Sequence, residues 1–352
     1  MKQNGKVTDF TLEIPENREI RILQITDMQP VDAGQKRFSE RIPDCEPLTE
    51  EMLYDTIYKY IEDGVKRFLP DLIIATGDLV YGEFDDSGRL LRSLVRFMEN
   101  LNVPWAPVFG NHDNESKKGV AWQCLQFENA THCMFKRGNV TGNGNYTIGI
   151  TRNGKLLRVL YMLDSNGCGQ AYRYAYCNNY PPYNENEIVK TDAGFGEDQL
   201  KWVEKSAADV NEAAGREVPK FFCFHIPESM IEDAVFEKGY QSSVERNGEL
   251  YDLDKNNLAK DGDFGKKGES ICFFRQPQFR ETLQKVGGVD GIFVGHDHKN
   301  TLSVLCHGVR VTYGLKTGTH DYHDNLGTTA ITVSENGVNF SIKHLYYKRS
   351  QI

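Results

Sequence analysis

Short β-rich runs alternate with helical patterns along most of the chain, and few architectures can accommodate that alternation. Six runs are predicted to be strands: residues 20–26, 71–76, 105–109, 156–163, 220–224 and 291–294. Between the first two, apolar residues recur at helical spacing from Leu53 to Phe68, and Thr49 is expected to cap this helix. Strands that alternate with helices of this length predict βαβ units. We therefore expect an α/β fold in which helices cover the sheet.

The end of the chain follows a different pattern. From residue 302 to 347, short strands succeed one another with turns at His307-Gly308 and Asn336-Gly337, which predicts an antiparallel portion. Two stretches, residues 166–196 and 238–270, interrupt the alternation, but it resumes after each, so we interpret both as surface excursions. The sequence predicts a single domain over residues 1–352, with a core from about 20 to 347.

The charge balance narrows the range of partners. Because 41 Lys and Arg face 50 Asp and Glu, the net charge of −9 argues against a protein that coats nucleic acid. No apolar run is long enough to predict a membrane span, and the first residues lack the apolar stretch of a signal peptide. We therefore expect a cytoplasmic protein. The sequence does not indicate its oligomeric state. A secreted protein is the alternative, because five N-x-S/T sequons begin at Asn114, Asn129, Asn139, Asn145 and Asn339.

Residue types that bind metals follow five of the predicted strands. The eight cysteines do not form a C-x-x-C pair, and we expect them to be buried free thiols. The carboxyl ends of parallel strands meet at one edge of an open α/β sheet, where ligands bind. A mixture of oxygen and nitrogen donors suits Mn, Fe or Zn rather than Ca. In chain order the candidate residues are Asp27 and Gln29, Asp78, Asn111 and His112, His225, and His296 and His298.

Two motifs carry most of this information. A lone Gly-Asp occurs by chance in nearly any chain, and His225 alone fits a core histidine as well as a ligand. Gly-Asn-His-Asp at 110–113 and Gly-His-Asp-His at 295–298 are rare by chance, and both follow predicted strands. Their glycines allow sharp turns where an ion and an anion can approach the backbone.

With its motifs in this order, the chain resembles the calcineurin-like metallophosphoesterases, whose pattern is D-x-H, G-D, G-N-H-[DE], a lone His and G-H-x-H. The match runs from about residue 20 to the end of the chain, and it looks most like the purple-acid-phosphatase-related branch. The resemblance implies a four-layer α/β/β/α sandwich of two mixed sheets, with a dinuclear metal site at the carboxyl ends of the strands.

The resemblance also implies a ligand set for two divalent or mixed-valence ions of Mn, Fe or Zn. Asp78 would bridge the two ions and limit their mutual repulsion. The neutral imidazole and amide ligands would leave the site electropositive towards phosphate. Asp27 and His298 would complete one site, and Asn111, His225 and His296 would complete the other.

The activity that the resemblance implies is hydrolysis of phosphate esters, monoesters in particular, by attack of a hydroxide that bridges the ions. His112 would assist the leaving group as a general acid or by electrostatic support. Asp113 would either orient His112 or be an ordinary loop carboxylate. We expect the substrate to be a small phosphorylated molecule or a phosphoprotein.

The first motif departs from the family pattern. It reads Asp27-Met28-Gln29, so a carboxamide stands where the family has a second histidine ligand, and carboxamides are weaker donors to transition metals. Tyr81 is the residue that would compensate, because Gly77-Asp78-x-x-Tyr81 matches the purple acid phosphatase variant in which a tyrosine binds ferric iron. Alternatively, Tyr81 packs in the core.

Some candidate contacts to substrate lie outside the metal ligands. Asn111 and His112 are expected to touch the phosphate, and His320 and His323 either reach it or are plain loop residues. Five tyrosines between residues 172 and 183 would line the pocket, or belong to an ordinary aromatic surface loop.

Two other functions remain open. One is a phosphodiesterase of the same fold. The other is a binding module, catalytically impaired because Gln29 replaces the usual ligand. The absence of G-x-S-x-G, of G-x-x-x-x-G-K-[ST] and of a complete G-x-G-x-x-G argues against serine hydrolases and the usual nucleotide-binding folds.

Overall fold

Two mixed β-sheets form the centre of the structure, a computed structural model that describes residues 7–35, 47–167, 193–240, 251–256, 259–318 and 325–347. The seven-stranded sheet has the order β1 (Phe10–Glu13), β5 (Tyr146–Arg152), β6 (Lys155–Met162), β7 (Lys220–Cys223), β10 (Val289–Val294), β12 (Val309–Tyr313) and β11 (Ser303–Cys306). The five-stranded sheet has the order β14 (Phe340–Tyr346), β13 (Gly327–Val333), β2 (Ile20–Ile25), β3 (Leu72–Thr76) and β4 (Trp105–Val108). A small third sheet pairs β8 (Tyr251–Asp252) with β9 (Lys266–Lys267).

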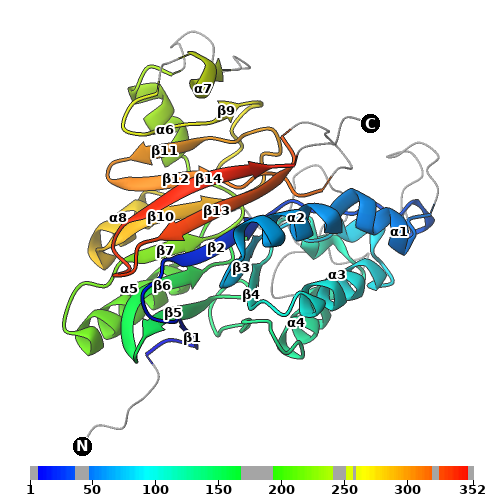
Figure 1. Ribbon diagram of the computed structural model, residues 1–352, viewed down its shortest axis with the longest axis horizontal. Helices are drawn as coiled ribbons and strands as arrows, with labels where there is room; N and C mark the ends of the chain where they lie inside the picture. The colour runs from blue at the N-terminus through cyan, green and yellow to red at the C-terminus, as the bar shows by residue number, and fades with distance from the viewer. Residues whose placement is uncertain are drawn as a thin grey trace, which may run out of the picture.

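Helices cover the outer face of each large sheet, so the two sheets pack against each other in the middle (Figure 1). On the side of the five-stranded sheet lie α1 (Glu50–Leu53), α2 (Lys59–Phe68), α3 (Arg89–Asn100) and α4 (Gly119–Glu128). On the side of the seven-stranded sheet lie α5 (Glu197–Ala214), α6 (Met230–Glu237) and α8 (Pro277–Val286), with α7 (Leu253–Asn256) farther out. The four-layer sandwich expected from the resemblance is therefore confirmed.

The side chains of the central strands alternate between two separate cores. In β7 and the residue after it, Phe221 and Cys223 belong to the core between the sheets, whereas Phe222 and Phe224 belong to the core under α5 and α8. Neighbouring side chains of a strand point to opposite faces, so a strand covered on both sides must be apolar throughout. This is why the central strands are nearly continuous apolar runs in the sequence.

The predicted strands are found within one or two residues of their expected ends. The expected antiparallel portion is also present, since β11 pairs with β12 and β13 pairs with β14 in antiparallel fashion. The helix predicted after Thr49 is interrupted, however. Thr49 caps α1 as expected, its Oγ1 accepting from the Met52 N–H at 3.2 Å, but a π-helical turn, Tyr54–Tyr58, separates α1 from α2.

No helix in the described ranges is both long and apolar enough to cross a membrane.

The sequon asparagines and the cysteines differ in how far they are buried. The side chains of Asn114 and Asn145, which begin two of the sequons, are buried. Of the cysteines that the structure describes, three are buried free thiols as expected, but Cys133 is partly exposed and Cys272 is exposed.

Candidate metal centre

Three buried side chains at strand ends converge on one point. Asp27 lies two residues beyond β2, Asp78 two residues beyond β3 and His225 two residues beyond β7. Each of the three offers a ligand atom, and these atoms all lie within 4.8 Å of one another. None of the three residues is more than 1% exposed. Two carboxylates and an imidazole so close together in the interior are a donor set for a cation.

The backbone around this point is held in an uncommon conformation. Asp27, Gln29, Asp78 and His296 all have positive φ, at 52°, 39°, 51° and 81°. Residues other than glycine rarely adopt such angles, and they concentrate at functional sites because the surrounding fold enforces them. Gly110 is required for a different reason, since a Cβ there would lie 2.1 Å from Asp78 Oδ1.

His225 is oriented in the way that metal-binding histidines usually are. Its Nδ1 lies 2.8 Å from the carbonyl oxygen of Thr76, which only accepts, so Nδ1 carries the proton. Its Nε2 then faces Asp78 Oδ2 at 3.3 Å and Asn111 Oδ1 at 3.2 Å. Burial alone lowers the pKa of His225, but the Asp78 carboxylate outweighs this and raises the pKa to about 10. The surroundings of His225 Nε2 therefore favour a positive charge.

The last motif completes the group from the seven-stranded sheet. The backbone N–H of His296 donates to the Asp27 carboxylate at 3.1 Å, and His298 Nε2 lies 3.5 Å from Asp27 Oδ1. The rings of His225 and His296 meet edge to face, with centroids 5.2 Å apart. Burial lowers the pKa of His296 to about 3, so its imidazole is neutral. The structure thus gathers Asp27, Asp78, Asn111, His225, His296 and His298, as the sequence predicts, and their role as ligands stays a prediction.

Gln29 presents its nitrogen, not its oxygen, to the carboxylates. Its Nε2 donates to Asp78 Oδ2 at 2.6 Å, and its Oε1 accepts from Lys316 Nζ at 3.0 Å. An ammonium group only donates, so Lys316 fixes which end of the amide is the oxygen. Lys316 Nζ also donates to the backbone carbonyl of Asp27 at 3.0 Å. No role was predicted for Lys316 from the sequence.

His112 lies beside the cluster and has two acidic neighbours. Its backbone N–H donates to Asp78 Oδ1 at 2.9 Å, and its Nδ1 lies 3.1 Å from both carboxylate oxygens of Glu115. Burial lowers the pKa of His112, but Glu115 and Asp78 together raise it to about 9. The ring is therefore protonated near neutral pH, as a general acid requires.

Asp113 does not orient His112. Its two oxygens accept from the backbone N–H groups of Val80 and Gly110, at 3.0 and 2.7 Å. This places Asp113 as a carboxylate that ties together two loops, one of the two alternatives open from the sequence. The carboxylate beside His112 is Glu115, which the sequence analysis missed.

The ring of Tyr81 packs against the ring of His112 at an angle of 35°. The two ring centroids are 4.2 Å apart and the ring of Phe84 lies 5.2 Å from that of Tyr81. Tyr81 is thus a packed aromatic residue next to the cluster, and its role as a ligand stays a prediction. His320, His323 and the tyrosines of residues 172–183 lie outside the described residues.

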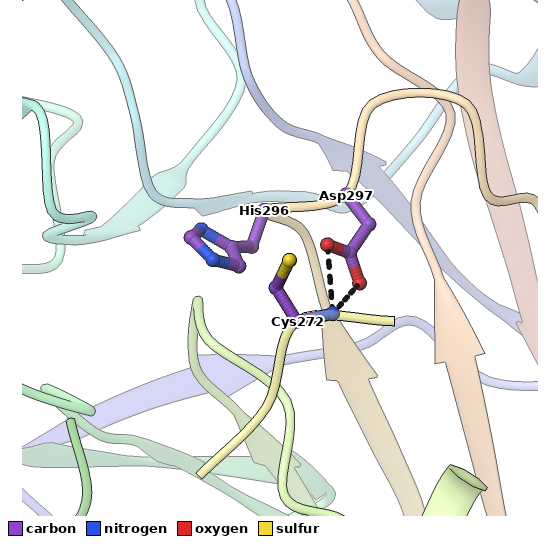
Figure 2. A group of neighbouring side chains, drawn as sticks. All are labelled: Cys272, His296 and Asp297. Carbon is purple, nitrogen blue, oxygen red and sulfur yellow. Dashed lines mark hydrogen bonds between the residues drawn. The ribbon is translucent and has the colours of Figure 1, made fainter. Parts of the chain in front are cut away.

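A second group of potential ligands adjoins the centre. Figure 2 shows the sulfur of Cys272 between the ring of His296 and the carboxylate of Asp297, and their ligand atoms lie within 4.8 Å of one another. Both oxygens of Asp297 are already engaged: each accepts from the Cys272 N–H, and Oδ2 also accepts from the Tyr313 hydroxyl at 2.6 Å. Burial raises the pKa of Asp297 to about 8 and that of Cys272 to about 11. Asp297 therefore anchors one loop to another.

The residues present fit a metal ion on one side of the cluster and not on the other. On the side of Asn111, His225 and His296, imidazole nitrogens and an amide oxygen lie beside the Asp78 carboxylate, a set suited to Mn, Fe or Zn. On the side of Gln29, the amide N–H faces the Asp78 carboxylate, and the Lys316 ammonium lies behind this amide, on its oxygen. N–H groups repel cations, so that side does not fit a second ion.

The family model for calcineurin-like phosphoesterases matches residues 20–300. Among similar proteins of Arabidopsis thaliana, probable inactive purple acid phosphatase 14 is 24% identical over 320 residues, covering 86% of this chain and 71% of that protein. Probable inactive purple acid phosphatase 29 is 26% identical over 323 residues, covering 87% and 74%.

A solved structure of similar extent is a dimetal phosphatase from Danio rerio. It is 15% identical, with a TM-score of 0.46 over 94% of this chain and 100% of that chain. The relatives named purple acid phosphatases confirm the predicted branch. The match of the family model over most of the sequence shows that the chain belongs to the calcineurin-like phosphoesterase family.

Proposed function

We propose that the protein hydrolyses phosphate monoesters, using a metal ion held by Asp78 and its neighbours. The observation that carries this proposal is the buried group of Asp27, Asp78 and His225, with His112 held beside it by Asp78 and Glu115. A bound divalent ion supplies Lewis-acid activation of water and of the phosphoryl oxygens.

The chain's own residues provide the rest of the chemistry. His112, held by Glu115, carries a proton that it can give to the leaving oxygen as the ester bond breaks. The same positive charge stabilises the charge that develops on the phosphoryl group. Asp78 accepts from the backbone N–H of His112 at 2.9 Å, so the loop that carries the proton donor is tied to the metal site.

The alternative with a specific observation behind it is a binding module without turnover. Two relatives carry the words "probable inactive" in their names, and in this chain Gln29 turns its nitrogen towards Asp78. Such a module would bind a metal ion and a phosphorylated molecule or phosphoprotein but would not hydrolyse it.

Turnover of p-nitrophenyl phosphate with Mn, Fe or Zn tests the proposal. Asp78→Asn and His112→Ala should each lower kcat at least about a hundredfold, as loss of a charge-stabilising or acid group usually does. Asp209→Asn and His307→Ala are matched controls, because both side chains are exposed and lie on other elements, so they should leave kcat unchanged.

The outcomes separate the candidate functions. Faster turnover of bis-p-nitrophenyl phosphate than of the monoester would identify a phosphodiesterase. Metal binding without turnover of either compound would favour the binding module, and turnover that survives Asp78→Asn would refute the proposed site.

A further inference from the structure

We propose that the buried ammonium of Lys316 takes the place of one of the two metal ions of the family's centre, so that this protein binds a single ion. The inference rests on the proposed function only in that the Asp27–Asp78–His225 group binds metal. It goes further by assigning the number of ions and by giving a role to Lys316, for which the sequence predicted none.

The position of Lys316 is built into the fold. The residue lies three positions beyond β12, in a segment bound to the end of β2: Thr26 and Lys316 form a parallel β-bridge, and the Thr317 N–H donates to the Thr26 carbonyl at 2.9 Å. Lys316 is only 1% exposed. Its Nζ therefore reaches the loop of the first motif from the neighbouring sheet, where it donates to the Asp27 carbonyl and to Gln29 Oε1, each at 3.0 Å.

Gln29 lies between the Lys316 ammonium and the Asp78 carboxylate and forms a hydrogen bond with each. Because Lys316 occupies the oxygen of the amide, the amide nitrogen must face Asp78, at 2.6 Å from Oδ2. A second ion coordinated by Gln29 would need the amide to turn over, which would place its N–H donors against the Lys316 ammonium. The two residues thus lock each other in an arrangement that excludes the ion.

The charges lead to the same conclusion. Asp27 and Asp78 place two carboxylates in the interior, and Lys316 adds a buried ammonium beside them, at 3.0 Å from the backbone carbonyl of Asp27. One divalent ion then leaves a small positive excess, which suits an anionic phosphate. Two divalent ions beside a buried ammonium would instead concentrate several uncompensated positive charges in a site shielded from water, and such an arrangement is unfavourable.

The experiment is a count of bound manganese on the purified full-length protein. Equilibrium dialysis against excess Mn²⁺ followed by elemental analysis should give one equivalent per chain, and the electron paramagnetic resonance spectrum should be that of an isolated ion rather than of an exchange-coupled pair. The double variant Gln29→His, Lys316→Met should bind two equivalents and give the coupled spectrum. Lys220→Met is the matched control, because Lys220 is also a fully buried lysine but lies at the far end of β7, and it should keep one equivalent.

The possible outcomes distinguish the role of Lys316 from the proposed phosphatase activity. Two equivalents in the wild-type protein would overturn the role of Lys316 while leaving a metal-dependent esterase intact, and a folded double variant that still binds one equivalent would overturn it as well. One equivalent without any phosphatase turnover would support the inference and refute the proposed function. No bound manganese in the wild-type protein would refute both. The wild-type measurements stand even if the double variant fails to fold, as circular dichroism would reveal.

Discussion

The pair formed by His112 and Glu115 gives the sharpest prediction, and Glu115→Gln is the change that isolates it. Both carboxylate oxygens of Glu115 lie 3.1 Å from His112 Nδ1, and the side chains are only 2% and 12% exposed. Glutamine preserves the size of the side chain and one acceptor oxygen but removes the charge. The proton on His112 then loses the partner that holds the ring in place and stabilises its positive form.

The expected loss follows from the strength of that contact. A hydrogen bond to a charged group contributes about 1.5–3 kcal/mol, and its loss in the transition state would lower kcat by roughly 10- to 150-fold. The KM should change little, because in the proposed mechanism Glu115 acts through His112 and not on the substrate. The assay is p-nitrophenyl phosphate turnover under saturating metal, with the thermal unfolding midpoint measured to confirm that the variant is folded.

A double-mutant cycle separates this role from a general loss of structure. If Glu115 acts through His112, the variant that combines His112→Ala with Glu115→Gln should be no slower than His112→Ala alone. The reasoning would be refuted by a Glu115→Gln enzyme that keeps wild-type kcat, or by losses in the double variant that multiply.

The remaining predictions concern metal binding and stability. Removal of metal should lower the thermal unfolding midpoint by several degrees, because an ion at a hundred times its Kd stabilises the folded state by about 2.7 kcal/mol; an unchanged midpoint with chelator would contradict a preformed site. Gly110→Ala should weaken manganese binding at least about tenfold in calorimetry while circular dichroism stays unchanged, because its Cβ would lie 2.1 Å from Asp78 Oδ1. Burial lowers the pKa of Lys220 from 10.5 to about 8, so between these pH values the unfolded chain binds more protons than the folded one. The wild-type protein should therefore gain stability relative to Lys220→Met as the pH rises from about 8 to 10.5 in denaturant titrations, and parallel stability curves would contradict this assignment.

The central strands could be predicted because burial on both faces makes them apolar throughout. The same reasoning missed β1, a strand of four residues at the sheet edge that alternates between partly buried and exposed positions. A short edge strand owes its conformation to its neighbour β5, with which it pairs in parallel, and not to its own pattern.

The π-helical interruption of the first helix was not predicted, although the spacing of apolar residues in the sequence indicates it. Leu53, Ile57, Ile61 and Val65 recur at three successive steps of four residues, and such steps overshoot the 3.6-residue turn of an α-helix. The wider π-helical turn, Tyr54–Tyr58, falls where these steps begin and helps to keep the apolar side chains facing the sheet.

In the candidate site, too, the residues that belong to a local sequence pattern could be predicted, whereas those placed only by tertiary contacts could not. The ligand types in the motifs could be predicted, because each follows a strand whose end is marked by the end of an apolar run. Glu115 could have been found from its place three residues after His112, since side chains three apart lie together in the 3-10 turn Asp113–Glu115. Lys316 could not, because its partners Asp27 and Gln29 are 289 and 287 positions away and only the docking of the two sheets brings them together.

That separation determines when the centre can exist. The ribosome makes the carboxylates that receive the ion well before His296, His298 and Lys316, which come more than 200 residues later. Contacts so distant in sequence form slowly and late in folding. Until then Asp27 and Asp78 have no fixed geometry with which to select an ion. Metal loading therefore has to wait until these residues have been made. A chain cut short before β10 would carry the first four motifs but would lack His296, His298 and Lys316.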